Sequence, residues 1–104
     1  MIRTSVCDLM GIEHPIALGG MGSIYSPSLV AAVSNAGGLG AMGCHNLSPE
    51  QIREGAAAIR EITNKPFAFN FLIFSAVEES FVAALAERPP HMAFAWPRPE
   101  QDIK

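Results

Sequence analysis

The residues best suited to chemistry are a glycine-rich segment near the N-terminus and one asparagine in an apolar run. Gly19-Gly20-Met21-Gly22-Ser23 directly follows the short apolar run Ile16-Ala17-Leu18. Glycines at the end of a strand let the backbone approach a flat ring or a phosphate closely, and the thioether of Met21 packs well on an aromatic ring. A plain tight turn would use the same glycines, so the segment by itself leaves both interpretations open.

Asn70 is the strongest single candidate for a ligand contact. It is the one polar side chain in the run Phe67-Ala68-Phe69-Asn70-Phe71-Leu72-Ile73-Phe74. A lone amide in an apolar strand must find hydrogen-bond partners or it costs stability. Its donor and acceptor suit the edge of a heterocycle, although a bond to neighbouring backbone is the alternative.

Two other side chains near a strand end are weaker candidates. His45 could act as an acid or a base, but a solvated loop histidine beside a helix cap is the preferred interpretation. Cys44 has no activating base nearby in the sequence and is interpreted as a small loop residue. With Cys7 it makes only two cysteines, too few for a metal cluster or a disulfide framework, and no metal site is predicted.

The segment Gly38-Leu39-Gly40-Ala41-Met42-Gly43 matches the pattern G-x-G-x-x-G. In dinucleotide-binding proteins that pattern follows a strand and opens a helix. Here it follows a predicted helix and contains the predicted strand. We therefore interpret its small residues as structural rather than as a dinucleotide site.

Proline and glycine divide the chain into alternating strands and helices. Ser26-Pro27 and Ser48-Pro49 each provide an N-cap with proline at the first helical position, and Gln51 completes a capping box. Strands are predicted at 16–18, 39–42, 67–74 and 91–95, and helices at 26–36, 48–64 and 77–87. The side chains expected to face inward are Leu29, Val33 and Ala36 in the first helix, Ile52, Ala56, Ile59 and Ile62 in the second, and Phe81, Ala84 and Leu85 in the third.

This order, βαβαβαβ, is typical of an α/β fold with parallel strands. A (β/α)8 TIM barrel needs ~250 residues, so residues 1–104 are predicted to form its N-terminal half and to be incomplete as a domain. A small open sheet is the alternative fold. Four strands alone would leave two open edges, so we expect self-association or pairing with a second half-barrel.

Composition excludes several classes of protein. The chain has 104 residues and a formal net charge of -3, which argues against a nucleic-acid partner because such a partner needs a basic surface. No apolar run approaches the ~18 residues of a membrane span, and no signal-peptide core develops at the N-terminus. We expect no membrane partner and a cytoplasmic location.

Four segments together resemble a known family. They are 15–22, 29–40, 47–51 and 65–70, and the run Val33-Ser34-Asn35-Ala36-Gly37-Gly38-Leu39-Gly40 is the most specific of them. They look like the N-terminal half of nitronate monooxygenases, once called 2-nitropropane dioxygenases. The flavin-type enoyl-ACP reductases share the same opening.

The resemblance implies an FMN-binding (β/α)8 barrel that oxidises a small molecule, an alkyl nitronate, to a carbonyl compound and nitrite with O2. It implies cofactor contacts from Gly20, Met21, Gly22, Ser23 and Asn70. The family's catalytic histidine and phosphate loops lie in the second half of the barrel, so no catalytic residue can be assigned in this chain. Two alternatives remain open: a non-catalytic truncated half-barrel, and an enoyl-ACP reductase-like flavoenzyme that uses NAD(P)H.

Overall fold

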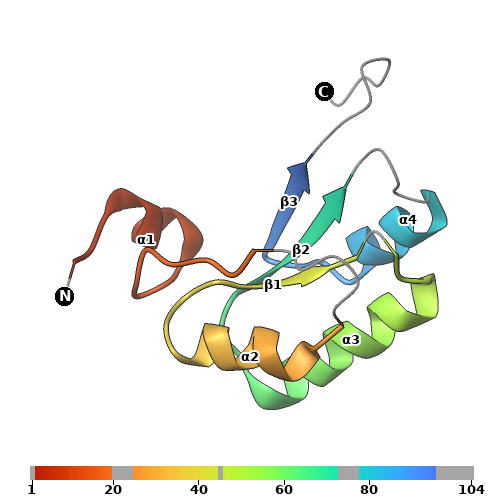
Figure 1. Cartoon of the computed structure of the whole chain (residues 1–104), viewed down its shortest axis with the longest axis horizontal. Helices are drawn as coiled ribbons and strands as arrows, with labels where there is room; N and C mark the ends of the chain where they lie inside the picture. Colours follow the sequence, from red (N-terminus) through yellow and green to blue (C-terminus); the bar gives the residue numbers. More distant parts are fainter. Residues whose placement is uncertain (1, 20–24, 45, 73–77, 96–104) are drawn as a thin grey trace.

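A computed structural model describes residues 2–19, 25–44, 46–72 and 78–95. Three parallel strands alternate with helices along the chain (Figure 1). The elements are α1 (Ser5–Met10), α2 (Pro27–Asn35), β1 (Gly40–Gly43), α3 (Pro49–Ile62), β2 (Phe67–Leu72), α4 (Glu78–Ala86) and β3 (His91–Ala95). None of the described helices is long and apolar enough to cross a membrane.

The sheet has the order β1-β2-β3. Helices α2, α3 and α4 pack along one side of it, whereas α1 lies apart from them at the N-terminal end of the chain (Figure 1). The alternation of strands and helices predicted from the sequence is therefore confirmed. The order of neighbours is also the order along the chain, as expected when each helix connects two adjacent parallel strands.

The first predicted strand is much weaker than expected. Over residues 16–18 the structure has a single parallel bridge, between Ala17 and Leu39, rather than a full strand. Two backbone hydrogen bonds support it, from Leu39 N to Ile16 O at 2.9 Å and from Leu18 N to Leu39 O at 2.8 Å. This short segment nevertheless continues the parallel arrangement beyond β1.

Local signals predicted the starts of α2 and α3 correctly. Ser48 accepts a hydrogen bond from Gln51 N while the Gln51 side chain accepts one from Ser48 N, so the predicted capping box is present. Ser26 caps α2 by accepting from Leu29 N. Gly37 follows α2 with φ 100°, a conformation that glycine adopts without the strain of a Cβ.

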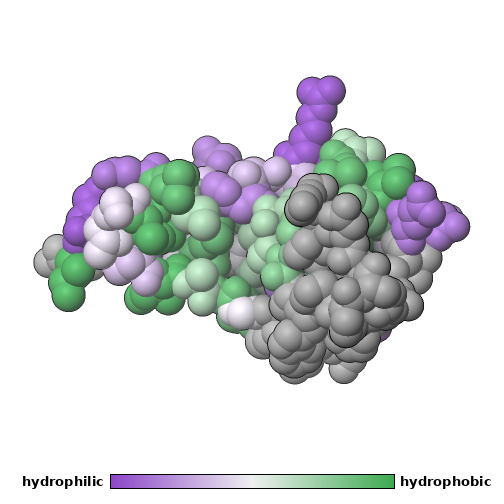
Figure 2. Space-filling model, turned by 90° about the horizontal axis from the view of Figure 1, so that it is seen from above, coloured by the Kyte–Doolittle hydropathy of each residue, from purple (hydrophilic) through white to green (hydrophobic). Residues whose placement is uncertain are grey.

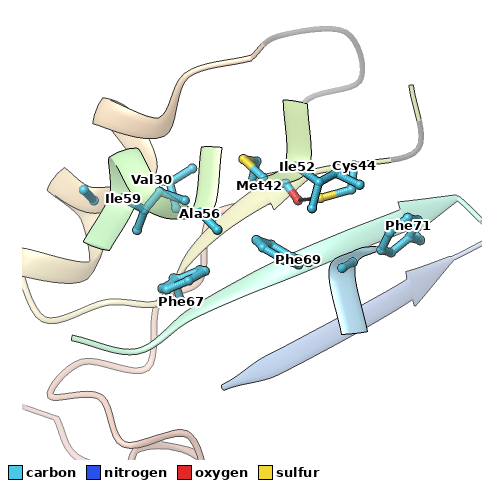
Figure 3. Packing of buried hydrophobic residues seen from close by; sticks show 11 residues of the cluster. Val30, Met42, Cys44, Ile52, Ala56, Ile59, Phe67, Phe69 and Phe71 are labelled. Atoms are coloured by element: carbon cyan, nitrogen blue, oxygen red, sulfur yellow. Dashed lines mark hydrogen bonds between the residues drawn. The ribbon is translucent and has the colours of Figure 1, made fainter. Parts of the chain in front are cut away.

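The core lies between the sheet and helices α2 to α4. Figure 3 shows Phe67, Phe69 and Phe71 pointing from β2 toward this side. They pack with aliphatic and sulfur side chains from β1, α2 and α3 and with Ala84 of α4. The other members of this cluster are Val30, Ala31, Met42, Cys44, Ile52, Ala56, Ile59 and Ala84.

The predicted inward faces of the helices were only partly right. In α3, Ile52, Ala56 and Ile59 are buried, but Ile62 is about half exposed. The prediction of burial was wrong for four residues, which are exposed because no described neighbour covers them. They are Leu29 on α2, Ala36 at the C-cap of α2, Ile62 on α3 and Leu85 on α4. The helices bury Val30, Ala31, Ser34, Ser80 and Ala83 instead.

Candidate functional site

The side chains of β2 divide between two faces of the sheet. Phe67, Phe69 and Phe71 belong to the helix-side core. Successive side chains in a strand point to opposite faces, so Ala68 and Asn70 lie on the other face. We call this second face the inner face of the sheet.

Strand register defines the rows on the inner face, and above the two that are described next Leu72 of β2 pairs with Ala95 of β3. Gly43, Asn70 and Ala93 are paired neighbours in one row, and Ala41, Ala68 and His91 form the row below. Neighbouring strands are ~4.8 Å apart. Asn70 thus stands between two positions with almost no side chain.

The lower row is already covered by the N-terminal segment. Cys7, Ile12, Leu39, Ala41 and Ala68 form a second buried cluster, with Met10 packed against it. The His91 ring also contacts this segment, with Nε2 2.9 Å from Met10 O. The lower half of the inner face is therefore structural, and the row with Asn70 is the candidate site.

Asn70 has the properties that a ligand contact requires. Its backbone oxygen is engaged, because it accepts a hydrogen bond from Cys44 N at 2.8 Å. Its side chain is half-buried, and among the described residues no side-chain hydrogen bond of Asn70 is found. The amide therefore offers a donor and an acceptor to a bound molecule. Since ligands of parallel α/β folds bind at the carboxyl ends of the strands, its place in the second half of β2 also fits.

The rest of the predicted cofactor site falls on residues that are not described. Gly20, Met21, Gly22 and Ser23 lie in the gap at 20–24, and His45 is outside the described residues as well. The preceding residue, Gly19, ends the segment that runs parallel beside Leu39. The proposed contact between this loop and a ligand remains a prediction.

Cys44 belongs to the core and not to the site. Its side chain is buried and its thiol donates to Met42 O at 3.4 Å. Burial raises the pKa of this thiol from 9.0 to about 12, with a smaller opposing effect from the backbone of Asn70. A thiol with so high a pKa is a poor nucleophile at neutral pH. The interpretation of Cys44 as a small loop residue leaves out that its side chain lies in the core.

The histidines of the described residues lie away from the row with Asn70. His14 packs against Gly37, and its Nδ1 is buried without a hydrogen-bond partner in the part of the chain that is described. His91 contacts Met10 as given above. Within the described residues, no group of three or more histidine, cysteine or acidic side chains could hold a metal ion.

A cavity of about 210 Å³ opens at the opposite end of β2. Arg60 at its wall is bound to Glu87 at 3.0 Å and lies over the Phe67 ring, with 5.5 Å from its Cζ to the ring centroid. That charge is therefore already neutralised. Because the cavity lies at the start of β2 while Asn70 is in its second half, it is separate from the candidate site.

The sequence did not reveal the neighbours of Asn70. Gly43 belongs to the G-x-G-x-x-G pattern and Ala93 lies within the predicted strand 91–95, and the sequence singles out neither of them. Their importance comes from the register, which pairs both with Asn70. The alternation of side chains in Gly40–Gly43, with Met42 toward the helices, would place Gly43 on the inner face. It would not show that Gly43 lies beside Asn70.

Comparison with known proteins gives a consistent result. The family model described as nitronate monooxygenase matches residues 3–94. A probable nitronate monooxygenase of Staphylococcus saprophyticus is 34% identical over 98 residues, which are 94% of this chain and 26% of that protein. The (3aS,4S,5R,7aS)-5-hydroxy-7a-methyl-1-oxo-octahydro-1H-indene-4-carboxyl-CoA dehydrogenase of Mycobacterium tuberculosis is 36% identical over 69 residues, 66% of this chain and 19% of that protein.

Among solved structures, FabK of Thermotoga maritima matches with a TM-score of 0.88 and 37% identity. The match covers 100% of this chain and 34% of that one. The chain thus spans about a fifth to a quarter of the curated relatives and about a third of this structure. Its strands and helices form part of a (β/α) barrel.

Proposed function

Because the chain belongs to the nitronate monooxygenase family, we propose that it is the FMN-binding N-terminal part of an oxidoreductase that acts on alkyl nitronates. The observation that carries the proposal is the Asn70 side chain, free of described hydrogen bonds and paired with Gly43 and Ala93. Two small neighbours leave room for a flat ring to approach the amide. The residues present therefore fit a flavin.

Asn70 would hold the edge of the ring by hydrogen bonds, and Gly20, Met21, Gly22 and Ser23 would supply backbone contacts along it. In such enzymes the protein binds and orients the flavin, and the flavin supplies the redox chemistry, here electron transfer from the nitronate to O2. These residues would bind and orient the flavin. The catalytic histidine that the resemblance implies has no counterpart that we assign here.

Flavin retention by the purified chain tests this proposal. FMN is added, unbound flavin is removed and the visible absorption spectrum is recorded. We expect weak binding with a shifted spectrum and negligible nitronate oxidation. An Asn70→Ala chain should retain less flavin, whereas Asn64→Ala, an exposed asparagine outside the inner face, should match the parent. Equal retention by both variants would remove Asn70 from the site, and no retention by the parent would show that these residues alone do not make a flavin site.

The match to FabK favours a second candidate, a flavoenzyme similar to the enoyl-ACP reductases that use NAD(P)H. Both functions need the same flavin contacts, so flavin binding does not separate them. The two are distinguished by the reductant in a protein that contains the rest of the barrel. Oxidation of NAD(P)H with an enoyl thioester supports the reductase, and consumption of a nitronate with O2 supports the monooxygenase.

A further inference from the structure

Cationic residues are distributed less evenly over this molecule than exposed apolar ones. Exposed apolar side chains occur on every helix and on β3, and at the left of Figure 2, where α1 lies, hydrophobic and hydrophilic residues are side by side. By contrast, the described residues include five lysines and arginines, and three of them line the cavity of about 210 Å³ at the start of β2. They are Arg60, Lys65 and Arg88. In a chain with a formal net charge of -3, such a concentration of positive charge is typical of a site that attracts an anion.

The cavity is formed by two neighbouring connections between helices and strands. Residues 63–66 connect α3 to β2, and Arg88 and Pro90 belong to the connection from α4 to β3. Both connections lie at the amino ends of the parallel strands. A ligand bound here would therefore not compete with one bound beside Asn70.

Two of the three cations have an acidic partner, but only one of them is firmly held. Arg60 binds Glu87 Oε1 at 3.0 Å and also donates to Glu87 O, so it joins α3 to the end of α4. Lys65 Nζ lies 3.8 Å from Glu13 Oε1, and both side chains are largely exposed. An ion pair this long and this exposed contributes little, so the ammonium group of Lys65 is available to a bound anion.

Arg88 is the cation most available to a ligand. Within the described residues its guanidinium has no hydrogen bond and no ion pair. Its φ of 50° is in the left-handed region, and among the described residues it is the one non-glycine residue with positive φ. Helices often end in this conformation, and glycine is the usual residue there because it has no Cβ. An arginine at this position costs stability without a described polar contact in return, which is typical of a residue retained for function.

We propose that this cavity binds a phosphate group, held by Lys65 and Arg88 with Arg60 as a fixed positive charge in the wall. The two available cations come from different connections, so an anion with several oxygens can bind both of them. A phosphate monoester carries nearly two negative charges at neutral pH, and the planar guanidinium matches its oxygens with two parallel hydrogen bonds. Two prolines and Phe67 form the apolar part of the wall, against which the organic part of such an ester can pack.

A phosphate titration of the full chain, followed by amide chemical shifts, tests the proposal. Inorganic phosphate replaces chloride at constant ionic strength, because salt screens non-specific attraction. We expect shifts that saturate at millimolar phosphate and are confined to residues around the cavity. Arg88→Gln and Lys65→Gln should each weaken binding about tenfold. Arg53→Gln is the matched control and should bind like the parent, because it removes an exposed arginine about two turns from Arg60 on α3, outside the cavity.

The outcomes of this titration are distinct. Shifts that do not saturate, that acetate reproduces at the same concentrations, or that persist in Arg88→Gln would overturn the proposal. Phenyl phosphate identifies the source of the group. Tighter binding than that of inorganic phosphate assigns the cavity to a phosphorylated small molecule, and equal binding assigns it to the free ion.

Arg88→Gly separates a binding role from a structural one. Glycine removes the guanidinium and suits the left-handed backbone, so we expect phosphate binding to weaken while the urea midpoint without phosphate rises. A lower midpoint with unchanged phosphate binding would show that the arginine only stabilises the end of α4, and the proposal would be wrong.

The phosphate proposal is independent of the proposed function. Arg88→Gln should retain flavin as the parent does, and Asn70→Ala should bind phosphate with the parent's affinity. A failure at either site is therefore recognised separately from a failure at the other.

Discussion

On the helix side of β2 every residue is a buried phenylalanine, whereas on the inner face Ala68 is buried by the N-terminal segment and Asn70 is only half-buried. The two faces belong to the same six residues, so backbone propensity cannot account for the difference. The helix side is filled by side chains of this chain. On the inner face, the lower row is covered by the N-terminal segment, and the row with Asn70 carries a polar group with no described side-chain hydrogen bond.

We expect the helix side of β2 to determine stability and the row with Asn70 on the inner face to determine ligand binding. Positions that point to the helices should be costly to change. Positions in the row with Asn70 should tolerate change in the free protein and matter when a ligand is present. Substitutions on the two faces test that distinction, and all unfolding measurements need one fixed protein concentration because association would add to stability.

The largest effect is expected from Phe69→Ala. Phe69 is fully buried and packs with Phe67 at 5.7 Å between ring centroids. Truncation of a buried phenylalanine costs ~3–5 kcal/mol, which is enough to unfold a marginal domain. Urea denaturation followed by circular dichroism measures the loss, with Ile62→Ala as a half-exposed control expected to cost under ~1 kcal/mol. Equal losses for the two variants would show that the helix side of β2 is not the main core.

High pH provides the second test of the helix side. The pKa of the buried Cys44 thiol is raised from 9.0 to about 12, so the folded chain keeps a proton that the unfolded chain loses. The contribution of this thiol to the free energy of unfolding is fully present below pH 9. It is lost as the pH rises through the folded pKa, and the free energy of unfolding then falls by up to ~1.4 kcal/mol per pH unit. Unfolding of the parent and of Cys44→Ala across pH 8–11 measures the difference. A parallel decline in both chains would contradict a buried, protonated thiol.

The sequence allowed the helix starts to be predicted because the signals are local. Ser48, Pro49 and Gln51 lie within one turn, and their hydrogen bonds need no distant partner. The short helix α1 was missed because it lacks such a signal: Thr4 occupies its N-cap position without a side-chain cap bond. Its place depends on Cys7 packing against residues of β1 and β2.

Burial was predicted less well because it depends on neighbours rather than on periodicity. Leu29 and Leu85 follow the helical period as well as Ile52 and Ile59 do, yet no described element covers them. Asn70 could be singled out from its polarity alone. Its neighbours Gly43 and Ala93 could not, since strand register is a property of the folded sheet.

A moderate effect is expected from Ser48→Ala, far from either face of β2. Ser48 and Gln51 exchange two hydrogen bonds at 3.2 Å and 2.9 Å at the start of α3. Loss of such a cap costs ~1 kcal/mol. Urea midpoints of Ser48→Ala and Gln51→Ala check this, and we expect both variants to keep the parent's flavin retention. A loss larger than that of Phe69→Ala would mean that α3, rather than the packing of β2, controls the stability of the sheet.

The smallest change in stability is expected from Asn70→Ala, and it gives the most direct test of the comparison. Because no described hydrogen bond is lost, the variant should unfold within ~0.5 kcal/mol of the parent, although it alters the strand with the longest described pairing. A loss above ~1 kcal/mol would show that the amide is satisfied inside the protein and serves the fold. Unchanged stability with reduced flavin retention would mean that the polar group on the inner face is maintained for a ligand, while the neighbouring phenylalanines are maintained for the core.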